Sequence, residues 1–169
     1  MSAARSPALP VPLPNELMRI RALDAGNIEA FRGMLGMFGA AFEDDRTYCS
    51  NQPDNLYLRQ LLANPNFVAI AAFSGPEVVG GLVGYVLPKF EQTRSEFYIY
   101  DLAVAEGHRR RGVATALIEE LKNQVRQRGV YVIFVQADYG DDPAVALYSK
   151  LGVREDVMHF DIFPSKSAG

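Results

Sequence analysis

Three consecutive arginines, Arg109 to Arg111, precede Gly112 and an apolar periodic run that begins at Val113. A helix N-terminus carries unpaired N–H groups and the positive end of the helix dipole. Gly112 has no Cβ atom, so a ligand can approach its backbone closely. Guanidinium groups beside such a terminus suit a pyrophosphate. A solvated basic cluster is the alternative, but the position between a strand and an amphipathic helix favours an anion site.

Two elements position this basic turn. The β-branched and aromatic run from Tyr98 to Val104 predicts a strand. The apolar residues from Val113 to Leu121 recur at a helical period and predict a helix with one buried face. A strand, a loop and a helix in this order form the context that a phosphate site needs.

The remaining elements follow from periodicity and turn chemistry. We expect a strand at 17–23, a helix at 25–42 capped by Asp24, a helix at 54–63, a hairpin of 67–73 with 78–87, a strand at 130–137, a helix at 144–151 capped by Asp142, and a last strand or strand pair at 153–163. Three consecutive strands followed by alternating helices and strands predict an α/β (α+β) fold, with a mixed sheet and helices on its faces.

The whole chain limits the classes of function. Its 169 residues and 49% hydrophobic content predict one domain at 17–169, after a flexible Pro-rich tail at 1–16. The net charge of -3 argues against a nucleic-acid partner. Cys49 is the only cysteine and there are two histidines, so neither a disulfide nor a metal site is expected. We find no signal peptide and no membrane-spanning run, and therefore expect a cytoplasmic protein without a membrane partner.

Family motifs are present at two places. The chain contains R-x-x-G-x-A at Arg109 to Ala114, preceded by L-A-V, and A-L-Y-S-K-L-G at Ala146 to Gly152. These segments resemble the GNAT superfamily of acyl-CoA-dependent N-acetyltransferases. The longer segments F-E-Q-T-R-S-E-F-Y-I-Y-D-L-A-V, V-Q-A-D-Y-G-D-D-P-A-V-A-L-Y-S-K-L-G and V-M-H-F-D-I are similar to type I aminoglycoside 3-N-acetyltransferases, the gentamicin enzymes. The resemblance covers residues 18–163 and implies the GNAT fold, with a mostly antiparallel central sheet and a splayed strand pair.

The resemblance also implies a cofactor site. Acetyl-CoA is the expected cosubstrate, without a metal. Its pantetheine arm pairs with the backbone at the splayed end of the central strand, at Leu102, Ala103 and Val104. The residues implied around the pyrophosphate are Arg109, Arg110, Arg111, Gly112, Val113, Ala114 and Thr115.

Acetyl transfer needs two proton-transfer groups, a general acid and a general base. The resemblance places Tyr148 at the position of the general acid, which protonates the departing CoA thiolate, with core packing as the alternative role. A protonated amine has no lone pair, so the reaction also needs a base. Asp101 is the first candidate because it directly precedes the splayed stretch, with pairing to an arginine as its alternative role. Glu96, Asp161 and bound water are further candidates for the base. Strand alternation does not rank them, since a bulge would change which face each occupies.

The substrate class follows from charge as well as resemblance. Aminoglycosides carry several ammonium groups, which acidic and hydroxyl side chains attract. The candidate substrate-binding residues are Glu96, Tyr100, Asp138, Asp141 and Asp142, with solvation or helix capping as the alternative role of the acids. We expect acetyl transfer to the 3-amino group by direct attack, conferring antibiotic resistance. Another polyamine or peptide amine, and a non-catalytic CoA sensor, are the alternatives. A homodimer is a family expectation.

Overall fold

The structure, a computed structural model, describes residues 18–164 of the chain. These residues form two compact units, one ending at Gln136 and one beginning at Ala137. The first unit carries the whole β-sheet, and the second carries the last helix. The single domain expected over 17–169 therefore stays a prediction, and the predicted tail at 1–16 lies outside the described residues.

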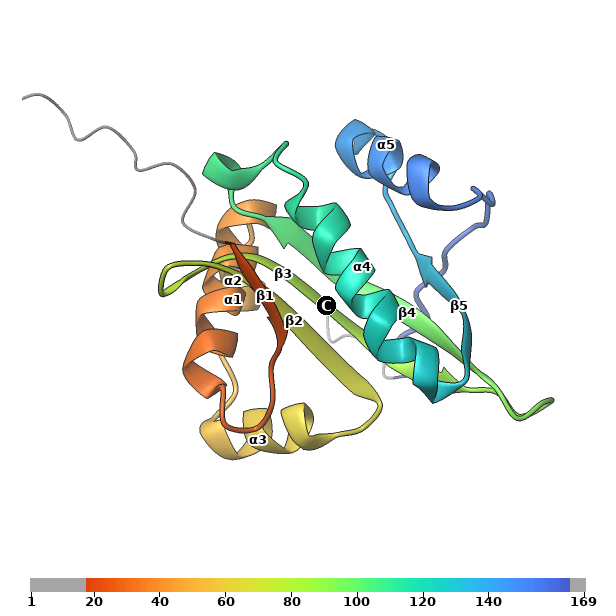
Figure 1. The fold of residues 1–169 in the computed structure, drawn as a ribbon, viewed down its shortest axis with the longest axis horizontal. Helices are drawn as coiled ribbons and strands as arrows, with labels where there is room; N and C mark the ends of the chain where they lie inside the picture. Colours follow the sequence, from red (N-terminus) through yellow and green to blue (C-terminus); the bar gives the residue numbers. More distant parts are fainter. Residues whose placement is uncertain (1–17, 165–169) are drawn as a thin grey trace, which may run out of the picture. The chain divides into compact units, whose positions relative to one another are not determined.

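Five strands form the sheet of the first unit, in the order β1-β2-β3-β4-β5 (Figure 1). They are β1 (Arg19–Ala22), β2 (Phe67–Ser74), β3 (Glu77–Pro88), β4 (Ser95–Val104) and β5 (Val130–Val135). Neighbouring strands from β1 to β4 run antiparallel, whereas β5 runs parallel to β4. The predicted mixed and mostly antiparallel sheet is confirmed.

Helices cover both faces of this sheet (Figure 1). In the first unit they are α1 (Ile28–Phe42), α2 (Asp45–Tyr48), α3 (Asn55–Ala63) and α4 (Val113–Val125), with short 3-10 helices η1 (Glu106–His108) and η2 (Arg126–Arg128). The odd-numbered residues from Phe67 to Phe73 belong to a core shared with α1 and α3. The even-numbered residues from Val68 to Ala72 are buried on the opposite face, where α4 packs.

The predicted caps of two helices are wrong by a few residues. The Asp24 carboxylate accepts a hydrogen bond from Gly26 N at 2.8 Å, which closes a local turn, and α1 begins only after Asn27. In the second unit, α5 (Asp142–Leu151) is capped by Asp141, whose Oδ1 accepts from Ala144 N at 3.1 Å. The Asp-Asp-Pro run offers two carboxylates for one cap, and proline is tolerated throughout the first turn.

The predicted last strand at 153–163 is wrong, because the structure has neither strand nor helix from Val153 to Phe163. Apolar and polar residues alternate there, as in a half-buried strand. A strand also needs a partner edge for its backbone groups, and the segment finds none within residues 18–164. Five of its apolar side chains are 70–89% exposed: Val157, Met158, Phe160, Ile162 and Phe163.

Candidate active site

The turn before α4 has the backbone shape that an anion site needs. Gly112 occupies the N-cap position with φ 79°, and Arg110 has φ 60°, so both lie in the left-handed region. No side chain caps this helix end, and Val113 is buried beneath it. The first N–H groups of α4 therefore have no partner within the helix and are free to bind an anionic group.

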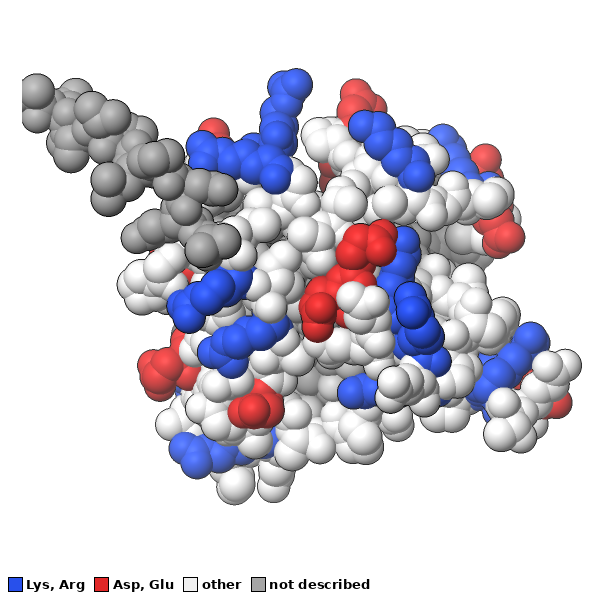
Figure 2. Space-filling view, viewed as in Figure 1, with Lys and Arg blue, Asp and Glu red and all other residues white. Residues whose placement is uncertain are grey.

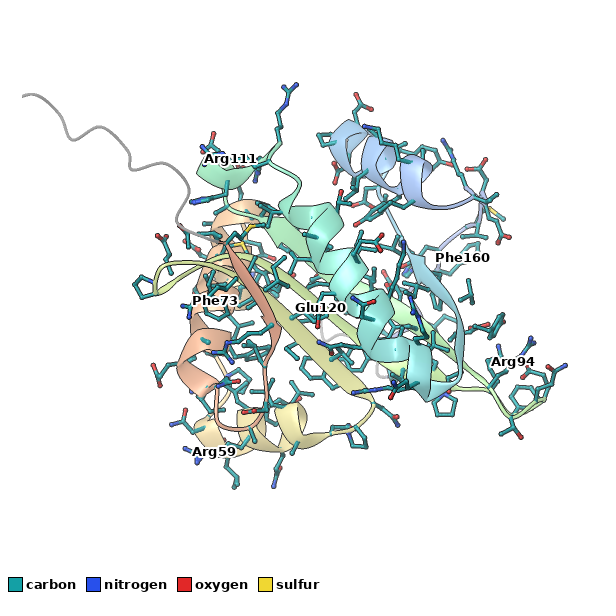
Figure 3. All side chains as sticks on the ribbon, in the orientation of Figure 1. Arg59, Phe73, Arg94, Arg111, Glu120 and Phe160 are labelled. Carbon is teal, nitrogen blue, oxygen red and sulfur yellow. The ribbon has the colours of Figure 1, made fainter. Side chains whose placement is uncertain are left out.

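The three arginines of this turn have different surroundings. The Arg109 Nε atom donates a hydrogen bond to the carbonyl oxygen of Val104 at 3.0 Å and so fastens the turn to the end of β4. Arg110 and Arg111 are exposed. Arg111 lies on the loop that leads into α4 (Figure 3), and basic side chains rise from this loop in Figure 2. Arg110 and Arg111 are thus accessible to a phosphate, whereas Arg109 has a structural bond.

Strand β4 loses its β5 neighbour halfway along its length. Parallel pairing ends where Ile99 faces Val135, while the pairing with β3 continues to Val104. From Tyr100 to Val104, the β5 side of the strand has no strand partner among the described residues. The predicted backbone-binding residues Leu102 to Val104 lie in this stretch. The expected splay of the strand pair is confirmed, and it leaves backbone donors and acceptors for an extended ligand.

A bulge in β4 turns Asp101 toward α1. Val83 of β3 faces Asp101, but the next residue, Gly84, faces Ile99, so Tyr100 has no counterpart. Without the extra residue, Asp101 would follow Ile99 onto the α4 face. With it, Asp101 lies on the α1 face, as does the core residue Ala103. Strand alternation alone could not rank the candidate bases, because this bulge decides which face Asp101 occupies.

Asp101 is half-buried and hydrogen-bonded. The hydroxyl group of Tyr48 on α2 donates to Asp101 Oδ2 at 2.9 Å. Asp101 also lines a cavity of about 190 Å³ whose other walls are apolar and aromatic. Burial raises the pKa of Asp101 above its usual value, and the Tyr48 hydrogen bond opposes that rise. Such a carboxylate is suited to hold and deprotonate a cationic amine.

Glu96 lies at the other end of β4 and is already paired. Lys89 Nζ is 3.2 Å from Glu96 Oε1, and the Tyr131 hydroxyl group donates to the same oxygen. The hydrogen bond from Tyr131 and then that from Lys89 hold the pKa of Glu96 below its usual value. Glu96 and Asp101 are five positions apart along the strand, roughly 16 Å at the usual rise. The structure therefore does not bring the two candidate bases together.

Tyr100, the bulged residue, belongs to a row of aromatic rings on the face that carries Asp101. Its ring is 6.0 Å from Tyr85 and 5.6 Å from Tyr98, centroid to centroid. The Tyr98 ring stacks in turn on Phe134 of β5 at 5.0 Å. Tyr100 is 60% exposed. The row offers aromatic rings against which a sugar ring can pack.

The remaining predicted residues lie in the second unit. Partial burial and then the Asp141 carboxylate raise the pKa of Tyr148, on α5, to about 12. Its phenol group is therefore protonated at neutral pH, as a general acid requires. Asp141 serves as the cap of α5, while Asp138 and Asp142 are exposed. Asp161, the weaker candidate for the base, lies 3.0 Å from the His159 ring.

Tyr48 is the residue of this site that the sequence did not reveal. It lies between the helices predicted at 25–42 and 54–63, where no element was predicted, and the four-residue helix that carries it is too short to show periodicity. A tyrosine after an Asp-Asp pair has no signature of its own. The only sequence signal for this helix was Asp44, because aspartate is a residue type that commonly caps helix N-termini.

Residues 18–164 hold neither a candidate metal cluster nor a membrane-spanning helix. In that range, no three His, Cys, Asp or Glu side chains lie where they could hold a metal ion. The helices found there are all too short or too polar to cross a bilayer.

Comparison with known proteins gives a consistent set of matches. A model described as the acetyltransferase (GNAT) family matches residues 35–153. An aminoglycoside acetyltransferase structure from an uncultured soil metagenomic sample is 54% identical, with a TM-score of 0.86, covering 88% of this chain and 99% of that one. A second such enzyme, in complex with sisomicin, is 31% identical, with a TM-score of 0.81, covering 88% and 97%.

Curated relatives have other acceptors. The ribosomal protein bS18-alanine N-acetyltransferase of Escherichia coli (strain K12) is 26% identical over 121 residues, which cover 72% of this chain and 70% of that protein. An N-alpha-acetyltransferase of Sulfurisphaera tokodaii is 31% identical over 96 residues. The match covers 50% of this chain and 58% of the S. tokodaii protein, less than two thirds of its length.

Proposed function

Because the chain belongs to the acetyltransferase (GNAT) family, we propose that it transfers an acetyl group from acetyl-CoA to an aminoglycoside, with the 3-amino group as acceptor. The likeness to two soil aminoglycoside acetyltransferases supports this substrate class. The observation that carries the proposal is Asp101, a carboxylate in an aromatic cavity on the strand whose edge opens at Tyr100. Acetylation of an ammonium group gives a neutral amide and so removes a charge that an antibiotic uses in binding, the chemical basis of resistance.

The residues around the splayed strand fit acetyl-CoA, which supplies the acetyl group as a thioester. The open backbone edge from Leu102 to Val104 suits the amide groups of the pantetheine arm. The N–H groups from Gly112 to Thr115 suit the pyrophosphate, with charge from Arg110 and Arg111. Arg109 acts indirectly, since its bond to Val104 holds the turn in place.

Asp101 and Tyr148 carry the proton transfers in this proposal. Asp101 binds the acceptor ammonium and takes its proton, directly or through water. The neutral nitrogen attacks the thioester carbonyl carbon, a C–N bond forms, and the C–S bond breaks. Tyr148 gives its proton to the CoA thiolate, and the second proton that the nitrogen loses as it becomes a neutral amide returns to the Tyr148 phenolate, directly or through water. No covalent enzyme intermediate is needed.

Each unit contributes its own kind of acceptor contact. In the first unit, Tyr100 and Tyr98 pack against a sugar ring. In the second unit, Asp138, Asp141 and Asp142 carry negative charge that attracts ammonium groups. Glu96 contributes less, because Lys89 neutralises it.

The first experiment mixes the full chain with acetyl-CoA and gentamicin, follows thiol release, and locates the acetyl group by NMR. Acetyl on the 3-amino group supports the proposal. Acetyl on another amine would overturn the regiochemistry. Thiol release with an alanine-initiated peptide and none with gentamicin would favour the second candidate, a peptide amine, which the Escherichia coli relative suggests. Cofactor binding without turnover of either acceptor would favour a sensor.

We also propose a homodimer that covers the apolar segment from Val157 to Phe163. Met158, Phe160 and Ile162 alternate along it, and each is more than 70% exposed. Burying them removes apolar surface from water. Sedimentation should show a dimer that dissociates in the double variant Phe160→Asp/Ile162→Asp. A wild-type monomer at all concentrations would contradict this assembly.

A further inference from the structure

One hydrogen bond connects α2, the short helix that follows α1, to strand β4. The Tyr48 hydroxyl group donates to Asp101 Oδ2 at 2.9 Å, across 53 positions of sequence. No hydrogen bond or ion pair occupies the other carboxylate oxygen, Oδ1, within residues 18–164. One oxygen of Asp101 is therefore held by the protein, and the other is available to a ligand.

The position of Tyr48 is set by the turn between α1 and α2. Glu43 ends α1 in the left-handed region with φ 56°, and Asp44 then caps α2 by accepting from Thr47 N at 3.0 Å. The Tyr48 ring packs against Phe38 and Phe42, with centroid distances of 5.9 and 5.5 Å. The ring is fixed by packing, so the direction of its hydroxyl group is fixed as well.

Asp101 is the only charged side chain among the described residues that line its cavity. The other titratable groups facing it are tyrosines: Tyr48 from α2, Tyr57 from α3, Tyr85 from β3, and Tyr98 and Tyr100 from β4. Asp44 lies near Tyr48 and adds a second negative charge there. No lysine, arginine or histidine lines this cavity to stabilise the carboxylate. The Tyr48 hydroxyl group, a neutral hydrogen-bond donor, thus stabilises the Asp101 carboxylate in place of a cation.

We propose that Tyr48 is a positioning residue for acetyl transfer: its hydroxyl group fixes the carboxylate of Asp101 and keeps it ionised to receive the acceptor ammonium. This inference rests on the role of Asp101 in the proposed function. Burial and the charge of Asp101 raise the pKa of Tyr48, so its hydroxyl group is always a donor at working pH. Loss of that donor leaves burial unopposed, and the pKa of Asp101 then rises further.

The test is Tyr48→Phe in the full-length chain, because phenylalanine keeps the ring contacts with Phe38 and Phe42 and removes only the hydroxyl group. Tyr85→Phe is the matched control: it removes a hydroxyl group from the same cavity that makes no hydrogen bond within the described residues. Two quantities are measured for each variant: kcat/KM for the acceptor against pH, and the titration of the Asp101 carboxyl carbon by NMR, assigned with Asp101→Asn.

We expect Tyr48→Phe to lower kcat/KM about tenfold at neutral pH, the effect of one hydrogen bond to a charged group. The acid limb of its pH profile and the Asp101 titration should both move to higher pH, and Tyr85→Phe should move neither. An unchanged acid limb in Tyr48→Phe, beside an inactive Asp101→Asn, would overturn the role of Tyr48 alone. Full activity of Asp101→Asn would overturn the proposed role of Asp101 and, with it, that of Tyr48.

Discussion

Gly84 lies so close to β4 that a Cβ atom at this position would overlap the backbone carbonyl oxygen of Tyr98. The contact occurs where the register between β3 and β4 shifts and Tyr100 is left without a counterpart. The bulge reverses the face of every residue that follows it, including Asp101. The absence of a side chain in one strand therefore decides where the carboxylate of the next strand lies.

Gly84→Ala should lower the free energy of unfolding by about 1–3 kcal/mol, because the methyl group meets backbone that is held by sheet pairing. Thermal unfolding followed by circular dichroism measures this loss, and kcat/KM should fall with it as Asp101 is displaced. Gly36→Ala is the control: apart from its chain neighbours and the backbone of its own helix, no heavy atom of residues 18–164 lies within 4 Å of its added Cβ, and alanine favours the α1 helix by roughly 0.5–1 kcal/mol. Equal stability of Gly84→Ala and wild type would show that the close approach is not needed.

Asp101→Asn should lower kcat by about 10²–10⁴-fold, the usual contribution of a general base, with acetyl-CoA affinity unchanged. Calorimetric titration with acetyl-CoA separates the two effects.

The same variant should be at least as thermostable as wild type at pH 7. The folded-state pKa of Asp101 is raised, so ionising this carboxyl costs stability above that pKa and costs none below the unfolded value. The difference in Tm should shrink as the pH falls toward 3.8. A variant that is less stable at pH 7 than at pH 4, relative to wild type, would contradict the burial of a charged Asp101.

Tyr148→Phe should lower kcat by about 10²–10⁴-fold while acetyl-CoA binding stays the same. In the wild type, a Tyr148 pKa of about 12 keeps the acid protonated, so Tyr148 should cause no loss of turnover below about pH 10. Single-turnover rates between pH 6 and 10 check both statements. Wild-type rates in Tyr148→Phe would remove this residue from the reaction.

Arg111→Ala should weaken acetyl-CoA binding several-fold at low salt, and the effect should shrink as salt rises, because Arg111 is exposed and its charge is screened. Arg126→Ala makes the same charge change just beyond the other end of α4 and should leave the Kd unchanged. Fluorescence or calorimetric titration at two salt concentrations measures both. Equal effects of the two substitutions would indicate general electrostatic attraction and no site at the turn.

Much of the turn before α4 was predictable from the sequence. The alternating residues of β4, the helical period of α4 and the glycine between them act over short distances along the chain, so each element follows from its own residues. Gly129 ends the 3-10 turn that follows α4 and lies in the left-handed region, with φ 66°. The last strand at 153–163 was predicted wrongly, because strand formation depends on more than the local sequence. Its alternation is local, but a strand forms only when a second edge accepts its hydrogen bonds.

The sequence by itself therefore determined the helices α1, α3, α4 and α5, most of the strands, and the strand–turn–helix order around Arg109 to Thr115, whose information lies within a few residues. Tertiary structure decided which acid lines the aromatic cavity. The bulge that turns Asp101 depends on Gly84 of the neighbouring strand, and the hydroxyl group that holds its carboxylate comes from Tyr48, 53 positions away. Neither partner is visible from the residues around Asp101, because register and side-chain contact arise only when separate elements pack together.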